Sequence, residues 1–180
     1  MKYKGLLVIL VCLIQFPLIS FGQSMAALKE KATTGDAFSQ RCFGSALLFG
    51  NGIRKNEKEA VVWLTRAADQ GDASAQFLLG GCYSEGMGVR VDSKKGIQLY
   101  RLAAEQGHAR AQAVLGICYG SGQGVSQNLV QAYAWCNVAA ANGAEDAANI
   151  RSAILKGMTP EQIAEGRRLS REYADKFGKK

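Results

Sequence analysis

The chain has 180 residues, of which 48% are hydrophobic and 21% are charged, and its formal net charge is +7. This length and balance fit one globular domain and exclude an intrinsically disordered chain. Glycine occurs 21 times and proline only twice, which favours helices separated by glycine turns over a proline-broken coil.

The first residues have the pattern of an export signal. Two lysines precede a mostly apolar run over residues 5–19, and Ser20-Phe21-Gly22 offers small residues at the positions that a signal peptidase reads. We interpret residues 1–22 as a signal peptide that is cleaved near Gly22. The alternative, a membrane anchor, needs roughly 20 apolar residues, and this run is shorter and contains Pro17. No later segment is apolar enough to cross a membrane, so we expect a periplasmic or secreted product.

A short segment with apolar residues follows the signal, and we predict that this segment, residues 23–34, forms an N-terminal capping helix. A repeat begins after it. Glycines then recur every 36 residues, at Gly35, Gly71, Gly107 and Gly143. Other positions repeat in the same register: Ala37/Ala73/Ala109, Gln40/Gln76/Gln112 and Gly44/Gly80/Gly116. Agreement at a fixed period indicates a repeat protein, whose units bury their apolar faces by stacking. We therefore divide residues 35–142 into three repeats.

Each repeat is predicted to be a pair of helices. In the second repeat, small and apolar residues recur at helical spacing on one face: Ala75, Leu79, Gly80 and Tyr83. Gly86 and Gly88 end this helix, and residues 93–106 form the next one. We expect Gly80 and Gly116 to lie where paired helices touch. The predicted fold class is all-α, a solenoid of stacked antiparallel helix hairpins.

Residues 143–180 are predicted to form a degenerate fourth repeat and a C-terminal capping helix. Its first helix would span residues 146–156, and Thr159-Pro160-Glu161-Gln162 has the pattern of a helix start with a capping box. Residues 151–180 carry eight basic and four acidic side chains. This excess indicates an acidic partner, an anionic membrane surface or simply a solvated helix face.

The repeated unit G-D-A-x-A-Q-x-x-L-G-x-x-Y-x-x-G-x-G-V resembles a Sel-one-like repeat, a TPR-like motif. Residues 71–89 match it without a gap, whereas His108 replaces the aspartate in residues 107–125. The first repeat has Ser39, Phe43 and Leu47 where the motif has Ala, Leu and Tyr. Residues 158–164 resemble the ending of exported bacterial members. The resemblance implies an α/α superhelix that serves as a protein-interaction scaffold and supplies no catalytic residues.

Motifs for catalysis, metals or cofactors are missing from the sequence. His108 is the only histidine, which excludes a histidine-based metal cluster. We interpret it as an exposed polar residue on the turn into the third repeat. The chain lacks G-x-S-x-G, and no serine has a lysine three residues later, as β-lactam chemistry would require. It also lacks a phosphate-binding G-x-x-x-x-G-K-[ST] loop. We therefore expect no enzyme activity, no cofactor and no metal.

Four cysteines follow the signal peptide: Cys42, Cys82, Cys118 and Cys136. Cys82 and Cys118 occupy equivalent positions and should lie about 10 Å apart, one helix-packing distance. A disulfide tolerates a Cα separation of only about 7 Å. If Gly116 faces Ala132, Cys118 and Cys136 are offset by roughly 9 Å along the helices. We interpret the cysteines as buried small apolar residues, and a disulfide stays the alternative. We assign Trp63 and Trp135, at matching positions, to the core.

The candidate binding surface is the concave side, which the first helix of each repeat is expected to line. Its positions between the packing residues vary from repeat to repeat, as a recognition surface should. They are Phe38, Arg41 and Ser45 in the first repeat, Ser74, Phe77, Gly81 and Glu85 in the second, and Arg110, Ala113, Ile117 and Ser121 in the third. Aromatic residues and arginine are favoured at interface hot spots. The alternative for Phe38 and Phe77 is contact with the next hairpin.

The sequence predicts a non-catalytic scaffold in the bacterial cell envelope that binds another protein and not nucleic acid. One specific role is an immunity protein that neutralises a toxic effector, such as a type VI secretion lipase, because small exported members with few repeats resemble such proteins. A second is a periplasmic regulator that restrains a membrane sensor. The alternative from another class is a cell-wall or β-lactam hydrolase, which the missing motifs disfavour.

Overall fold

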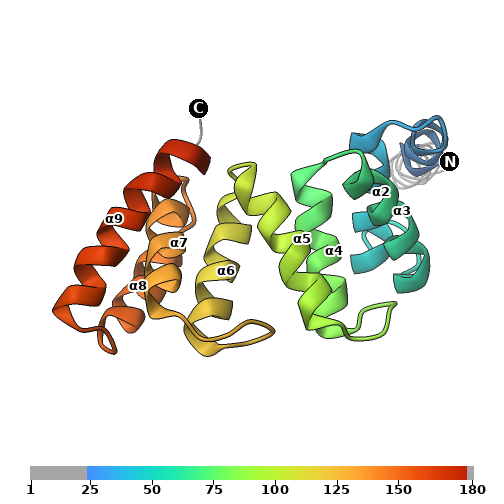
Figure 1. Cartoon of the computed structure of the whole chain (residues 1–180). Coiled ribbons are helices and arrows are strands. Elements are labelled where there is room, and N and C mark those ends of the chain that lie inside the picture. The colour runs from blue at the N-terminus through green and yellow to red at the C-terminus, as the bar shows by residue number, and fades with distance from the viewer. Residues whose placement is uncertain (1–23, 178–180) are drawn as a thin grey trace, which may run out of the picture.

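The computed structural model describes residues 24–177, and every regular element in that range is a helix (Figure 1). A short helix over residues 24–33 precedes three hairpins. The hairpins are α2 (Ala37–Phe49) with α3 (Glu57–Asp69), α4 (Ala73–Glu85) with α5 (Ser93–Glu105), and α6 (Ala109–Ser121) with α7 (Leu129–Ala141). Helices α8 (Ala147–Leu155) and α9 (Pro160–Phe177) complete the described chain. The hairpins follow one another in chain order, which confirms the predicted all-α solenoid.

Equivalent helices of the three hairpins begin and end at positions 36 residues apart, because equivalent capping residues recur. The first helices begin behind Asp36, Asp72 and His108, whose side chains accept a hydrogen bond from the backbone N–H three residues later. The same helices end at Gly50, Gly86 and Gly122. These glycines have φ angles of 75°, 77° and 77°, in the left-handed region that favours glycine.

The two helices of each hairpin approach closely at a glycine of the first helix. A methyl group added to Gly116 would overlap Cys136 Sγ and would lie 3.2 Å from the carbonyl oxygen of Ala132. One added to Gly80 would lie 2.8 Å from the ring of Tyr100. Both glycines therefore lie at the predicted helix contacts, and Gly116 faces Ala132 as expected.

A buried glutamine repeats on each first helix and forms equivalent hydrogen bonds in every unit, at Gln40, Gln76 and Gln112. Its amide donates to an alanine carbonyl of the preceding helix, as from Gln112 Nε2 to the Ala104 oxygen at 2.9 Å. Its own carbonyl accepts from the residue that ends the same hairpin, as from Asn142 Nδ2 at 2.8 Å. Because a buried amide is costly without partners, these bonds explain why glutamine recurs at this position.

The first repeat packs well despite its departures from the motif. Phe43 is 1% exposed, and its ring meets the edge of Trp63 with centroids 5.5 Å apart. Leu47, which replaces the tyrosine of the motif, is also buried. Trp63 and Trp135 are buried as well, which confirms their assignment to the core.

Helix α9 begins with the predicted capping box: the Thr159 backbone N–H donates to Gln162 Oε1 at 3.0 Å, and the Gln162 N–H donates to Thr159 Oγ1 at 3.3 Å. The helix then packs along α7. Trp135 of α7 contacts Tyr173 and Phe177, with ring centroids 4.5 Å and 5.6 Å away. At its end, the Phe177 carbonyl accepts from Gln112 Nε2 at 3.2 Å. The C-terminal helix therefore covers the third hairpin.

The four cysteines of the described chain are free thiols. Cys82, Cys118 and Cys136 are buried as expected, whereas Cys42 is only half-buried, as are Leu78 and Val114 at the equivalent positions of α4 and α6. Burial raises the pKa of Cys82 to about 11 and that of Cys136 to about 12. Both thiols are therefore protonated at neutral pH and are poor nucleophiles.

The predicted signal peptide, residues 1–22, lies outside the described residues. Between residues 24 and 177, we find no helix with the length and apolar character that crossing a membrane requires. The same residues contain no group of three or more histidine, cysteine or acidic side chains placed to hold a metal ion.

Candidate binding groove

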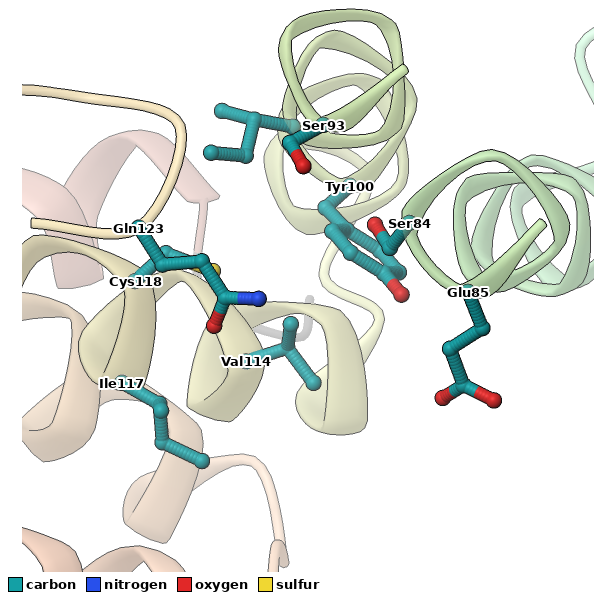
Figure 2. A pocket seen from close by; sticks show the side chains of 9 residues that line it. Ser84, Glu85, Ser93, Tyr100, Val114, Ile117, Cys118 and Gln123 are labelled. Atoms are coloured by element: carbon teal, nitrogen blue, oxygen red, sulfur yellow. The ribbon is translucent and has the colours of Figure 1, made fainter. Parts of the chain in front are cut away.

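One hollow opens between α4 and α6 and has a volume of about 210 Å³. Figure 2 shows Tyr100 of α5 beside Ser84 of α4, with Val114 of α6 across from them. We call this the α4–α6 hollow; its lining residues are Ser84, Glu85, Ser93, Ile97, Tyr100, Val114, Ile117, Cys118 and Gln123. Hydroxyl and amide groups alternate here with aliphatic side chains, which suits an occupant that is partly polar and partly apolar.

A second hollow of about 320 Å³ lies between α6 and α8. We call this the α6–α8 hollow; its lining residues are Phe77, Arg110, Ala113, Val114, Ile117, Gly143, Ala144, Glu145, Asp146 and Ile150. Val114 and Ile117 line both hollows, so the two are adjacent along α6. We refer to them together as the groove.

Ile117 separates the two hollows and is 45% exposed, which is high for a large aliphatic side chain. The neighbouring Val114 is half-buried. An occupant that covers Ile117 would remove apolar surface from water, which contributes roughly 25 cal/mol per Å² before the costs of association. The apolar centre of the groove can therefore anchor a partner side chain.

The charged residues of the groove lie among its lining residues: Glu85, Arg110, Glu145 and Asp146. Within residues 24–177, none of the four forms an ion pair with its neighbours. Their charges therefore stay available to an occupant.

The structure brings five of the candidate residues together in the groove. Phe77, Arg110 and Ile117 line the α6–α8 hollow, and Glu85 lines the α4–α6 hollow. Ala113 also lines the groove but is buried. The remaining candidates of the second and third repeats, Ser74, Gly81 and Ser121, line neither hollow.

The candidates of the first repeat lie on α2, apart from the groove: Phe38, Arg41 and Ser45. Arg41 Nε forms an ion pair with Asp72 at 3.1 Å, and its guanidinium lies 4.8 Å from the ring centroid of Phe38. Phe38 remains 61% exposed. Arg41 thus joins two repeats, and a binding role for these three residues stays a prediction.

Phe77 also contacts the next hairpin, which was the alternative role considered for it. Its ring stacks on His108 of the next repeat with centroids 4.8 Å apart. The interpretation of His108 as an exposed turn residue was wrong. His108 is half-buried, and its Nδ1 accepts the Ala111 backbone N–H at 3.2 Å to cap α6. Burial lowers the pKa of His108, which favours the neutral ring that this hydrogen bond requires.

The sequence missed several groove residues, in particular Tyr100 from α5 and Glu145, Asp146 and Ile150 from the α8 region. The comparison of equivalent repeat positions could not find them, because only the first helix of each repeat was expected to line the binding surface and the fourth unit does not match the motif. Val114 could have been found, because it lies on the same stripe as Arg110 and Ile117 at helical spacing.

Comparison with known proteins agrees with this architecture. A family model described as Sel1 repeat matches residues 43–72, 73–108 and 109–143. The first match begins within α2, where the chain departs from the motif. A comparison with curated protein sequences gives no significant match.

Three solved structures are similar. The first is c5321, a protective antigen of uropathogenic Escherichia coli with an SLR fold, at 35% identity and a TM-score of 0.82; the match covers 87% of this chain and 34% of that protein. A Sel1 repeat protein from Oxalobacter formigenes is 36% identical, with a TM-score of 0.65 over 73% of this chain and 98% of that one. Cysteine rich protein B of Helicobacter pylori shares the fold at 23% identity, with a TM-score of 0.58 over 73% of this chain and 94% of that one. Since the family model covers more than half of the sequence, the chain belongs to the Sel1-repeat family, whose members are generally non-catalytic scaffolds for protein–protein interaction.

Proposed function

We propose that this Sel1-repeat protein is an exported, non-catalytic scaffold of the bacterial envelope that binds one partner protein in the groove. The observation that carries the proposal is the pair of adjacent hollows along α6, which share the exposed Ile117. Positions that are identical in the repeats are used mainly for packing and capping, while most of the positions that line the groove vary between repeats. This division is what a repeated scaffold with one specific partner requires.

The specific role that we put first is neutralisation of a toxic effector, such as a type VI secretion lipase. Restraint of a membrane sensor is the second candidate, and both roles use the same surface. An immunity protein would protect cells that are attacked by the effector, and a regulator would change the output of the sensor instead. Growth in competition with an effector-producing strain, with and without the gene, separates the two.

The test of groove binding compares two arginine substitutions at residues of similar exposure. Ile117→Arg places a long charged side chain between the two hollows, whereas Val62→Arg places one on α3, outside the groove. We expect Ile117→Arg to abolish recovery of the partner from the envelope fraction and Val62→Arg to retain it. Helix content should match the parent in both. Loss with Val62→Arg and retention with Ile117→Arg would move the site to the outer helices.

Export is tested separately by mass spectrometry of the protein from the envelope fraction. The proposal expects a mature chain that begins near Gln23. An intact Met1 on the protein in that fraction would contradict it.

A further inference from the structure

The charge of the groove is opposite to that of the rest of the molecule. The groove is lined by three acidic side chains and one basic one. The whole chain has a formal net charge of +7. A concave surface of one sign attracts segments of the opposite sign, and it does so most strongly where apolar walls exclude water.

Three other hollows lie on α3, α5 and the loops, and each has more basic than acidic side chains. The hollow beside Gly88 has three basic and one acidic side chains. The hollow beside Arg101 has two basic and one acidic, and the hollow beside Ile53 has the same ratio. An acidic lining therefore distinguishes the groove from these surfaces and is not a general property of the chain.

Acidic residues line both of the hollows that share the exposed Ile117. Glu85 ends α4 in the α4–α6 hollow, and Glu145 precedes α8 in the α6–α8 hollow. Both side chains are exposed and, within residues 24–177, neither forms an ion pair or a side-chain hydrogen bond. In the first repeat, the position of Glu85 is occupied by Phe49, so the acidic residue is not a requirement of the fold.

We propose that the groove recognises a segment of the partner in which an apolar side chain is flanked by lysine or arginine. This inference rests on the proposed function and adds the chemistry of the partner. The apolar side chain covers Ile117 and Val114, and the flanking cations lie near Glu85 and Glu145. Arg110 is the single basic residue of the lining, and it disfavours segments whose cations all fall at that end of α6.

The experiment measures binding of short fluorescent peptides by anisotropy. Three peptides share a central leucine that is flanked by lysines, by glutamates or by glutamines, and a fourth has the lysines but glycine in place of leucine. We expect the lysine–leucine peptide to bind most tightly, with an affinity that falls as salt is added. The glycine peptide should bind more weakly, because it cannot cover Ile117.

Paired variants test whether Glu85 and Glu145 are responsible for the preference for lysine. Because two exposed charge pairs are lost, we expect the double variant Glu85→Gln with Glu145→Gln to weaken binding of the lysine–leucine peptide by up to about thirtyfold. The matched control is Glu30→Gln with Glu105→Gln. These two residues are also exposed but lie outside the groove, so the control should leave the affinity for the peptide unchanged. Equal binding of the glutamate peptide, or no response to the groove pair, would overturn the inference.

The variant Ile117→Arg separates this inference from the proposed function. One outcome is that the glutamine peptide binds the parent but not Ile117→Arg, while the lysine–leucine peptide binds no more tightly than the glutamine peptide. The groove is then a binding site, but the proposed preference for basic segments is wrong. If no peptide responds to Ile117→Arg, both proposals fail.

Discussion

The imidazole ring of His108 stacks on the ring of Phe77, with centroids 4.8 Å apart and the planes inclined by 25°. One repeat earlier, the equivalent positions hold Asp72 and Arg41, which form an ion pair at 3.1 Å. The capping residue Asp72 thus pairs with the guanidinium of Arg41, whereas the capping residue His108 stacks on the ring of Phe77. In both places a side chain of one first helix is attached to the start of the next, so the contact helps to fix the angle between repeats.

Acidification should weaken the contact at His108. Burial lowers the pKa of His108, and Arg110 adds to this effect, while the backbone hydrogen bond at His108 and the charge of Asp72 oppose it. The folded value therefore lies below the unfolded value of about 6.5. The unfolded chain then binds more protons, and the stabilisation is complete above about pH 6.5 and is lost as the pH falls through the folded value. We expect the melting temperature to fall less between about pH 7 and pH 5 in His108→Asn than in the parent, because asparagine keeps the cap without titrating. If the melting temperatures of His108→Asn and the parent fall equally between these pH values, protonation of His108 does not control this contact.

Close packing at Gly116 should make this position intolerant of side chains. Gly116→Leu would overlap Cys136 Sγ, and we expect it to lower the free energy of unfolding by about 1–3 kcal/mol or more in urea titrations. Gly120 is the matched control on the same helix, since an added methyl group would lie 3.7 Å from Ile154 Cγ1, at ordinary contact distance. Gly120→Ala should be neutral or stabilise by about 0.5–1 kcal/mol, as alanine usually does inside a helix. Equal effects of the two changes would show that the hairpin contact is wrong.

The buried glutamines should differ in importance along the chain. Gln112 and Gln76 form equivalent bonds within the repeats, but Gln112 also donates to the Phe177 carbonyl. Replacing a buried hydrogen-bonding group typically costs about 1–3 kcal/mol when its partners are left unsatisfied. We expect Gln112→Leu to destabilise the protein more than Gln76→Leu and to increase amide hydrogen exchange at the end of α9. If exchange there is unchanged, the bond to Phe177 does not hold the helix.

Most of the fold could be predicted from the sequence because glycine and capping residues recur at one spacing. The boundaries of the hairpins, the contact between Gly116 and Ala132 and the capping box at Thr159 all depend on such local signals. The repeated glutamines were recognised as a fixed position, but their hydrogen bonds join residues about 30 apart and cannot be read from one helix. The same limit applies to α9, whose packing along α7 depends on contacts between the aromatic rings of Trp135, Tyr173 and Phe177.

The groove was predicted only in part. Candidates from α4 and α6 were found because those helices keep the repeat register, and Phe77, Glu85, Arg110 and Ile117 do line the hollows. The wall that α8 contributes was missed, since the fourth unit departs from the motif and gives no register to follow. Phe38 and Arg41 keep the register too, yet their mutual contact and the ion pair with Asp72 involve Arg41 in packing between repeats.

Site-specific photo-crosslinking in the source cells tests whether the groove binds the partner. A photoreactive amino acid replaces Ile117 in the groove or, as the control, Leu102, which is 49% exposed on α5 outside it. We predict that residue 117 forms a crosslink to one discrete protein and that residue 102 does not. A crosslink to the same protein from residue 102, with none from residue 117, would show that the partner binds outside the groove.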